Sequence, residues 1–421
     1  MFPLNRMLGA FVKRGRLTVR DAGGAVHVFA GATMEGPDGV TLRPVTMRIH
    51  DAALYRKLVL NPELHMGEAY MDGTVTFEDG STIRDFLVLF SANRYSLAEL
   101  PIQKALYRAK MWLRKVQQSN RRGEAQKNVA HHYDIGNEFY RLFLDKNLLY
   151  SCAYFRSPDE TLEEAQRNKL RLLAAKLDLR PGQRVLDIGC GWGDLALYLA
   201  QLEEVEVTGV TLSKEQQELA SKRARDMGLA SRVRFELKDY RDVAGKFDRI
   251  VSVGMFEHVG VHHYDEFFAQ VNALMPDDGV MLLHSIGKMS PPGTASPWYR
   301  KYIFPGAYSP ALSEVFEVIE RQHLWCLDLE FLRLHYAMTL RHWCERFEKN
   351  RARVVEMYDE RFARMWEFYL ISAEMMFRTG SQLVFHMQLS RRRDAVALQR
   401  DYIVDRQRAY LEREKKLELV I

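Results

Sequence analysis

Apolar and polar positions alternate in two different ways along the chain. Between 17 and 85, short apolar runs such as AVHVFA and VTMRIH are separated by glycine turns such as DAGG and EGPDG. This pattern is typical of short strands joined by tight turns. From 161 onwards, amphipathic segments with helical spacing alternate with short apolar runs. The first stretch therefore predicts a small α+β module, and the second predicts an α/β unit.

The α/β stretch begins with a clear helix signal. Thr161 followed by Glu164 forms a capping box, and apolar residues then recur at helical spacing up to Pro181 and Gly182. The apolar runs beyond this helix predict a doubly wound, mainly parallel sheet, whose ligand site lies at the carboxyl ends of the strands. These runs are RVLDIG, VEVTGVTL, RVRFELKDY, FDRIVSVG and GVMLLHSI.

The pattern changes again after these runs. The irregular, aromatic stretch 287–310 is typical of a lid. Two further candidate strands, WCLDLEFL and QLVFHMQL, flank helices predicted between 336 and 377. The C-terminal segment is dense in both charges, which predicts an exposed helix. We expect three parts along the chain: an N-terminal α+β domain at 1–99, a basic helix and linker at 100–128, and an α/β domain at 129–421 with a lid-like insert at about 287–325.

Composition narrows the class of protein. The chain is 47% hydrophobic and 27% charged, with a mean hydropathy of −0.29, which predicts a soluble globular protein without a transmembrane span. Basic residues between 6 and 16 interrupt the apolar N-terminus too early for a signal peptide. We therefore expect a cytoplasmic protein. The four cysteines form no CxxC pair, so the sequence predicts neither a metal site nor a disulfide framework.

The net charge of +5 is concentrated in one segment. The stretch 100–123, LPIQKALYRAKMWLRKVQQSNRRG, interleaves lysine and arginine with apolar residues at helical spacing. Two interpretations stay open for it: a solvated connecting helix with an apolar seam on one domain, or a helix that lies on a membrane surface. Nothing in the charge pattern indicates a nucleic-acid partner.

A glycine-rich loop carries the first chemical signal. VLDIGCGWGDLA places Gly189, Gly191 and Gly193 between a predicted strand and a predicted helix. A plain tight turn with positive φ explains such glycines as well, and GxGxG occurs in both dinucleotide-binding folds and methyltransferases. Asp187 on the strand, the missing third glycine of GxGxxG, and Tyr240 at the end of the third strand favour S-adenosylmethionine over NAD. In that position the tyrosine suits an adenine ring.

Several motifs together resemble a known family. The second strand ends in VTGVTLS without the usual acidic residue for ribose hydroxyls. With HHYDIGNEFY, YSCAYF, GMFEHVG and HSIG, in this order between 131 and 287, it resembles the cyclopropane-fatty-acyl-phospholipid synthases and the related mycolic acid cyclopropane synthases. The likeness continues more loosely through WYRKYIFPG and CERFEKN, and the N-terminal module is similar to the family's accessory domain.

This resemblance implies an activity and a cofactor site. The activity is transfer of a methylene group from S-adenosylmethionine to the double bond of an unsaturated fatty acyl chain of membrane phospholipid. The missing side chains of the glycines agree with close approach of a ligand to the loop. The residues expected to surround S-adenosylmethionine are Tyr133, Tyr150, Ser151, Asp187, Gly189, Gly191, Gly193, Thr211, Leu212, Gln216 and Tyr240.

The reaction itself needs a base in a dry site. An isolated alkene that accepts a methyl group becomes a carbocation, and ring closure requires loss of a proton from the new methyl. Glu257 follows the fourth strand and His284 ends the fifth, so both should reach the carboxyl edge of the sheet. The resemblance implies that they surround a bound bicarbonate, the proton acceptor, together with Cys152, Tyr336 and the backbone of Ile286.

Plainer roles compete with these assignments. Glu257 would also suit a helix cap, and His284 would also suit a hydrogen-bonded core histidine. Cys152 has no base near it in sequence and is predicted to be a pocket wall rather than a nucleophile. His258 and His262 carry no supporting motif and are predicted to be structural or surface residues.

Two other functions fit the same motifs. One is methylation of an unsaturated acyl chain without ring closure, giving a methyl-branched or methylated-diene product. The other is a lipid-binding protein that has kept the fold and lost catalysis, against which the intact glycines, Glu257 and His284 argue. For the enzyme we expect an unsaturated, anionic phospholipid as partner, a peripheral location at the inner face of the membrane, and, from the resemblance alone, a homodimer.

Overall fold

The computed structural model describes residues 1–36, 41–101, 103–106, 108, 111 and 135–417. The chain divides into two compact units, each built from separate segments. Unit 1 comprises Met1–Gln117, Gly293–Pro305 and Leu340–Ser381, and unit 2 comprises Gln118–Pro292, Gly306–Thr339 and Gln382–Ile421. This division differs from the expected one because two segments assigned to the α/β domain pack with the N-terminal residues. Domain boundaries predicted from a sequence delimit continuous segments, whereas a compact unit can be formed by segments that are far apart in the chain.

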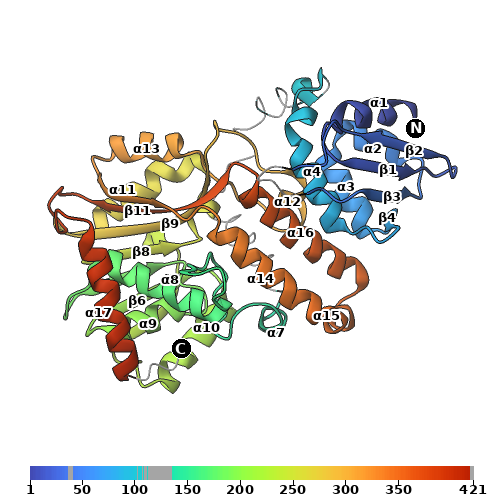
Figure 1. Ribbon diagram of the computed structural model, residues 1–421. Coiled ribbons are helices and arrows are strands. Elements are labelled where there is room, and N and C mark those ends of the chain that lie inside the picture. The colour runs from blue at the N-terminus through green and yellow to red at the C-terminus, as the bar shows by residue number, and fades with distance from the viewer. Residues whose placement is uncertain (37–40, 102, 107, 109–110, 112–134, 418–421) are drawn as a thin grey trace. The chain divides into compact units, whose positions relative to one another are not determined.

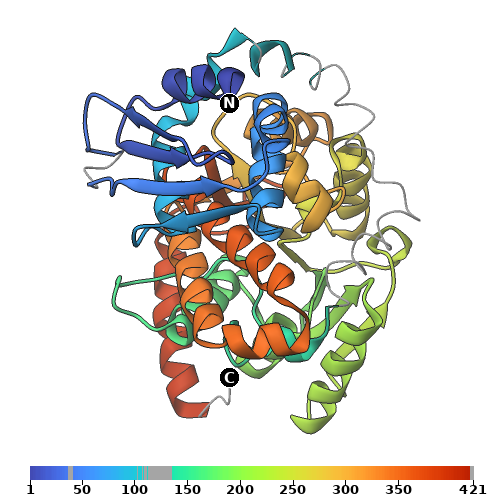
Figure 2. The same ribbon diagram turned by 90° about the vertical axis from the view of Figure 1, so that its right-hand side faces the viewer.

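Unit 1 contains a small α+β module with a four-stranded sheet in the order β2-β1-β3-β4 (Figure 2). Strand β1 runs antiparallel to β2 and parallel to β3, and β3 runs antiparallel to β4. The runs AVHVFA and VTMRIH form β2 and β3, as predicted. The strands are β1 (Arg16–Arg20), β2 (Val26–Ala30), β3 (Val45–Ile49) and β4 (Val75–Glu78), and the helices are α1 (Phe2–Phe11), α2 (Leu54–Leu60), α3 (Pro62–Met71) and α4 (Ile83–Ala98).

Later segments complete unit 1 through buried side chains. Trp298 is buried against Gly67, where an added Cβ would collide with the indole ring. The Tyr70 hydroxyl donates to Glu367 at 2.6 Å, and a guanidinium–carboxylate pair joins α4 to α16 at 2.7 Å. The added helices are α12 (Pro297–Tyr302), α15 (Arg351–Met357) and α16 (Glu360–Arg378), and α14 (His335–Lys349) contributes to both units.

Unit 2 is built on a seven-stranded sheet in the order β10-β11-β9-β8-β5-β6-β7 (Figure 1). The five strands from β9 to β7 are parallel neighbours, and β11 and β10 continue the sheet antiparallel. The predicted mainly parallel, doubly wound sheet is confirmed. The strands are β5 (Arg184–Ile188), β6 (Glu206–Thr211), β7 (Val233–Leu237), β8 (Arg249–Val253), β9 (Val280–Lys288), β10 (Trp325–Phe331) and β11 (Gln382–Ser390).

Helices cover both faces of this sheet. Val185 of β5 packs into the core on one face, and Leu186 packs into the core on the other, so the strands read as nearly continuous apolar runs. Strand order reverses at β5, which places a crevice at the carboxyl ends of β5, β6 and β8. The helices of one face are α8 (Leu162–Leu177), α9 (Asp194–Leu202), α10 (Lys214–Asp226) and α17 (Asp401–Leu417), and those of the other are α11 (Tyr264–Leu274) and α13 (Leu312–Arg321).

The predicted capping box at the start of α8 is confirmed. The Glu164 amide donates to Thr161 Oγ1 at 3.3 Å, and the Thr161 amide donates to Glu164 Oε2 at 2.8 Å. The helix ends at Leu177, earlier than Pro181 and Gly182 suggested. Asp178 stops it by adopting the left-handed conformation, with φ of +45°.

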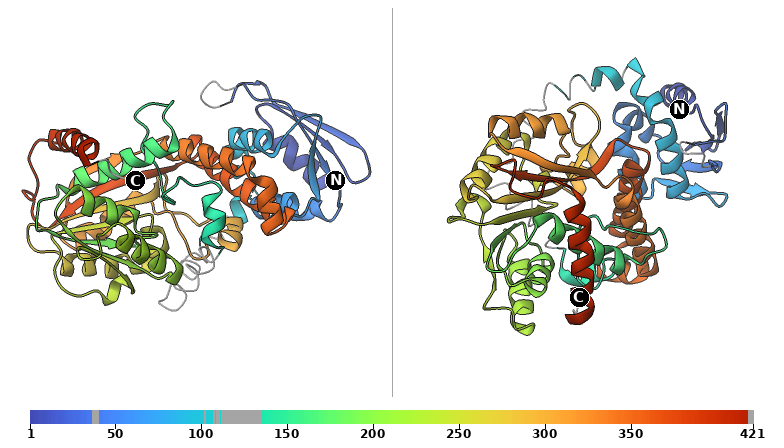
Figure 3. Two further views of the ribbon diagram at one scale, coloured as in Figure 1. Left: turned by 90° about the horizontal axis from the view of Figure 1, so that it is seen from below. Right: turned by 60° about the vertical axis from the view of Figure 1, so that its left-hand side comes forward.

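The charge density of the C-terminal segment predicted an exposed helix. Helix α17 is instead partly buried. It lies along α8 (Figure 3, right) and buries Ile403, Tyr410 and Glu414. The Glu414 carboxylate accepts hydrogen bonds from Arg171 Nε at 2.8 Å and from the Tyr198 hydroxyl at 2.6 Å. A few buried positions at helical spacing therefore decide its packing, while the remaining charges face solvent.

Removing the carboxylate of Glu414 should destabilise unit 2. In Glu414→Leu, the buried Arg171 guanidinium loses its counter-charge, which typically costs about 3–5 kcal/mol. Chemical unfolding followed by circular dichroism measures the loss. The control is Glu412→Leu on the same helix, where the carboxylate is exposed and the free energy of unfolding should stay close to wild type. Equal effects of the two substitutions would contradict a specific role of the buried pair.

Candidate active site

The glycine loop joins β5 to α9 at the crevice. Its backbone is tied to β6, because the amides of Gly189 and Cys190 both donate to the Val210 carbonyl, at 2.9 and 3.0 Å. Gly189, Gly191 and Gly193 adopt φ values of +81°, +54° and +88°, a region that residues with a Cβ rarely occupy. The loop therefore requires glycine for its conformation as well as for any ligand.

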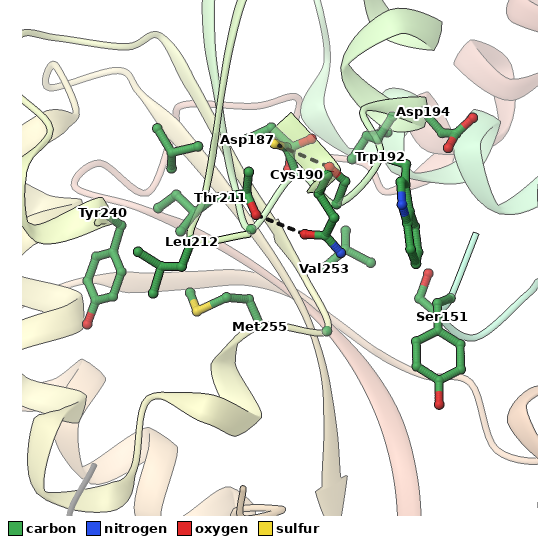
Figure 4. A pocket seen from close by; sticks show the side chains of 18 of the residues that line it. Ser151, Asp187, Cys190, Trp192, Asp194, Thr211, Leu212, Tyr240, Val253 and Met255 are labelled. Atoms are coloured by element: carbon green, nitrogen blue, oxygen red, sulfur yellow. Dashed lines mark hydrogen bonds between the residues drawn. The ribbon is translucent and has the colours of Figure 1, made fainter. Parts of the chain in front are cut away.

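A pocket opens at this loop and lies within unit 2 (Figure 4). A Cβ on Gly191 would meet no protein atom within 4 Å, whereas a Cβ on Gly193 would collide with Phe235. Gly193 is not among the lining residues, and its absent side chain serves packing. Tyr133 lies outside the described residues. The predicted residues that line the pocket are Tyr150, Ser151, Asp187, Gly189, Gly191, Thr211, Leu212, Gln216 and Tyr240.

The pocket has further wall residues that the sequence analysis missed. Trp192 and Tyr240 lie on opposite sides of it (Figure 4), and Trp192 Nε1 donates to Asn137 Oδ1 at 2.6 Å. His258 also lines it, and burial lowers the pKa of this histidine to about 4. Trp192 could have been found from its place inside the glycine loop. His258 follows the candidate residue Glu257 in the sequence, but this position alone does not indicate that the side chain of His258 faces the pocket.

Lys169 on α8 is the least expected lining residue. Its ammonium group is buried and donates to Ser151 Oγ at 2.9 Å. Burial lowers the pKa of Lys169 to about 8, and the charges of Asp145 and Asp194 oppose that shift. In the sequence, this lysine reads as an ordinary helix position, since only the packing of α8 shows which residues turn towards the sheet.

The carboxyl group of Asp187 contributes an acidic side chain to the lining of the pocket. Its Oδ2 is buried and has no hydrogen-bond partner among the described residues, and burial raises the pKa of this carboxyl to about 7. Such an atom is costly unless a ligand group meets it. The Thr211 hydroxyl donates to Gln216 Oε1 at 2.9 Å beside it. The ammonium group, ribose hydroxyls and adenine of S-adenosylmethionine match these acidic, hydroxyl and aromatic groups.

A second group of predicted residues gathers at the carboxyl ends of β8 and β9. Glu257 Oε1 accepts a hydrogen bond from the Ile286 amide at 2.6 Å. Oε2 of the same carboxyl is buried without a hydrogen-bond partner among the described residues, and burial raises the pKa of Glu257 to about 7. The carboxyl of Glu257 and the backbone of Ile286 are therefore in direct contact. A carboxyl with one engaged and one unengaged oxygen is oriented for a ligand.

His284 and Cys152 are both buried and both lie within reach of the charge of Lys169 on α8. His284 Nδ1 is 2.7 Å from Nε2 of His386 on β11. Cys152 is buried, its thiol donates to the Ala153 carbonyl at 3.3 Å, and burial raises the pKa of the thiol far above its usual value. The charge of Lys169 acts on the pKa of both His284 and Cys152. A protonated, buried thiol agrees with a pocket wall.

Tyr336 belongs to the first turn of α14, which is tied to the segment of Cys152. The Ala153 amide donates to Thr339 Oγ1 at 3.0 Å, and the Phe155 amide donates to His335 Nδ1 at 3.1 Å. Tyr336 itself is buried. Within the described residues, no three histidine, cysteine, aspartate or glutamate side chains form a metal-binding group, and no helix is long and apolar enough to cross a membrane.

The sheet, the glycine loop and the pocket at its switch point define an S-adenosylmethionine-dependent methyltransferase. Residues 120–387 match the sequence family described as mycolic acid cyclopropane synthetase. The chain belongs to this family, whose members include enzymes that build cyclopropanes on unsaturated lipids. The resemblance seen in the motifs is thereby confirmed.

Individual relatives agree with this assignment. The chain is 37% identical over 348 residues to the cyclopropane-fatty-acyl-phospholipid synthase of Escherichia coli, covering 83% of this chain and 88% of the relative. It is 36% identical over 360 residues to the tuberculostearic acid methyltransferase of Mycobacterium tuberculosis, covering 80% of this chain and 81% of the relative. Among solved structures, mycolic acid cyclopropane synthase CmaA1 with SAH and CTAB superimposes with a TM-score of 0.60 at 34% identity, covering 63% of this chain and 98% of that one.

Substitution of Gly191 should affect the cofactor rather than the fold. In Gly191→Ala, the new methyl group enters the pocket and lies within 4 Å of no other protein atom. Affinity for S-adenosylmethionine should therefore fall at least about tenfold, a loss near 1.4 kcal/mol. Isothermal titration calorimetry measures it. Gly228→Ala is the matched control, because Gly228 also has positive φ and open space around its Cα, but does not line the pocket. Equal affinity in the two variants would contradict the prediction.

The raised pKa of Glu257 makes a prediction about stability. A folded-state pKa of about 7, above the ordinary value of 4.5 for a glutamate, means that folding opposes ionisation of Glu257. The resulting cost in stability is absent below pH 4.5, grows up to pH 7 and is complete above it. In carbonate-free buffer, Glu257→Gln should therefore be more stable than wild type by on the order of 2 kcal/mol at pH 8, with little difference near pH 5. Thermal unfolding at both pH values measures this. A constant difference, or one matching exposed Glu218→Gln, would refute it.

Proposed function

We propose that this methyltransferase forms a cyclopropane on the unsaturated acyl chain of a membrane phospholipid, with bicarbonate as the proton acceptor. The observation that supports the proposal best is the carboxyl of Glu257. It is buried, one of its oxygens is held by the Ile286 amide, and the other is left for a ligand. An oriented polar group in a water-poor site is what ring closure needs after methyl transfer.

The bonds change in two stages. The alkene takes the methyl group from the sulfonium, so a carbon–sulfur bond breaks, a carbon–carbon bond forms, and S-adenosylhomocysteine and a carbocation result. A proton then leaves the new methyl group, and its electron pair closes the ring onto the cationic carbon. Water would capture the cation before closure. Burial of Cys152, Glu257 and His284 supports exclusion of water from the site.

The side chains of the site fit a small anion. Bicarbonate, when bound, supplies the weak base. With a pKa of about 7, Glu257 is partly protonated at neutral pH and then donates through Oε2 while Oε1 still accepts from Ile286. His284 and the Tyr336 hydroxyl would complete the donor set. The thiol of Cys152 stays protonated because burial raises its pKa, so it adds no competing negative charge.

A second product is favoured by the names of some relatives. The tuberculostearic acid methyltransferase and a probable fatty acid methyltransferase of Pseudomonas putida are named for methylation rather than for ring formation. Both outcomes share the carbocation and differ in which proton leaves it. Position of the base relative to the new methyl group therefore decides the product.

The remaining proposals concern the partner surface. An anionic bilayer would suit the basic residues of the stretch 100–123, but Arg114, Lys115, Arg121 and Arg122 lie outside the described residues. Peripheral association with the inner face of the membrane, and a homodimer, follow from the resemblance alone. Flotation with anionic and neutral vesicles, together with analytical ultracentrifugation, would test these proposals.

Lipid analysis and carbonate depletion test the proposed function together. Expression in a host without cyclopropane lipids should add the mass of one CH₂ to unsaturated acyl chains, and the product should resist ozonolysis, which cleaves a methylated alkene. Removing dissolved carbonate should slow purified enzyme, and adding it back should restore the rate. Glu257→Gln should lower the rate about a hundredfold or more, because an oriented acid–base group contributes that much.

The control for that experiment is His262→Gln, which changes an exposed side chain and should leave the rate unchanged. Ozonolysis-sensitive products would favour methylation without ring closure. A wild-type rate indifferent to carbonate, with Glu257→Gln still inactive, would favour Glu257 itself as the base. Absence of any lipid change, without binding of S-adenosylmethionine, would favour the non-catalytic alternative.

A further inference from the structure

His386 stands directly behind His284 in the sheet. The two residues are paired across the antiparallel strands β9 and β11, and Nε2 of His386 lies 2.7 Å from Nδ1 of His284. Both side chains are almost completely buried. His386 belongs to the apolar run QLVFHMQL, where the sequence analysis expected only a strand. Nothing in the motifs pointed to it.

One proton lies between the two rings, in the hydrogen bond that joins Nδ1 of His284 to Nε2 of His386. Burial lowers the pKa of each histidine well below its usual value, and the positive charges of Lys169 and Lys176 lower both further. Neither ring is therefore an imidazolium at neutral pH. A neutral imidazole has one N–H and one bare nitrogen, so either His386 donates to His284 or His284 donates to His386.

The surroundings of His386 decide between these arrangements. Its other ring nitrogen, Nδ1, is buried and has no hydrogen-bond partner among the described residues. If His284 donated, the proton of His386 would sit on this Nδ1 as a buried N–H without an acceptor, which is the rarer and costlier kind of unpaired group. If His386 donates, Nδ1 carries a lone pair, which the field of the Lys176 ammonium stabilises.

Other charged groups around the pair do not reverse this preference. Glu330 on β10 lies opposite His386 in the strand register, but its carboxylate is 2.6 Å from the Lys176 ammonium, which neutralises it. Asp328 lies on the same lysine at 3.6 Å. His335 at the start of α14 adds no negative charge, because burial lowers its pKa. The lysine charges that act on the pKa of His386, those of Lys176 and Lys169, both lower it, which agrees with a lone pair on Nδ1.

We propose that His386 is a positioning residue of the active site, which donates from Nε2 to Nδ1 of His284 and so keeps the proton of His284 on Nε2. His284 then presents only a donor to a ligand. It can hold an anion or another acceptor in place, and it cannot take the proton that leaves during ring closure. The role assigned to this donor rests on the proposed function, whereas the position of the proton does not.

Nuclear magnetic resonance of the wild-type enzyme with ¹⁵N-labelled histidine tests the position of the proton. The resonances of His284 are assigned by their loss in His284→Gln. We expect Nε2 of His284 to be protonated and Nδ1 to be bare, as the hydrogen-bond partner of one nitrogen fixes the tautomer of the ring. Protonated Nδ1 in the wild type would overturn the proposal. This measurement needs neither turnover nor a substitution at 386.

Substitutions at 386 test the consequence for the reaction. His386→Leu removes the donor at similar volume and should lower kcat about ten- to a hundredfold, as in metal sites when the group that orients a metal-bound histidine is lost. His386→Gln keeps an N–H donor and should restore most of the activity. Affinity for S-adenosylmethionine should be unchanged in both variants, since His386 does not line that pocket.

The matched control is Met387→Leu, at the next position of β11, where the side chain packs on the opposite face of the sheet. It should retain wild-type kcat. A fall in Met387→Leu as large as in His386→Leu would assign the effect to packing and overturn the positioning role, as would wild-type kcat in His386→Leu or a glutamine variant as slow as the leucine variant. An inactive wild type would instead refute the proposed function, leaving the resonance experiment valid.

Discussion

Two carboxyl groups held away from water at one edge of a sheet are the constraint around which unit 2 is organised. Asp187 lies near the end of β5, Glu257 follows β8, and each keeps one buried oxygen without a hydrogen-bond partner among the described residues. Burying such groups opposes folding. The cost is offset because the sheet is covered by apolar helices on both faces. Ligands that supply donors or positive charge would relieve this cost.

A buried ammonium acts on one of these two carboxyls, that of Asp187, and on neighbouring residues of the site. Lys169 reaches the pocket from α8, binds Ser151, and its charge acts on Asp187, Cys152 and His284. One side chain therefore links the cofactor pocket to the second group of residues. In a medium of low polarity, a charge acts over longer distances than it would at the surface. The protonation of the site is for this reason a collective property of the residues around α8.

The two antiparallel strands at the end of the sheet extend it beyond the parallel core and support the site as well. Strand β11 follows the helices of unit 1 in sequence, returns to unit 2, and brings His386 to His284 across 102 positions of the chain. The chain leaves unit 2 after Thr339, contributes the segment Leu340–Ser381 to unit 1, and re-enters the sheet of unit 2 as β11 beside β9. The pairing register of β9 and β11 then decides which side chains meet.

The sequence by itself determined the elements and the cofactor loop. Apolar periodicity located the strands, Thr161 and Glu164 marked the start of α8, and the glycines and their neighbours indicated S-adenosylmethionine, because these signals are local and act within a few residues. Only the tertiary structure decided which helix positions face the sheet, as for Lys169 and Glu414, and which residues pair across strands, as for His386. Such contacts depend on the rotation of helices and the register of strands, which arise when distant segments pack and leave no periodic trace in the chain.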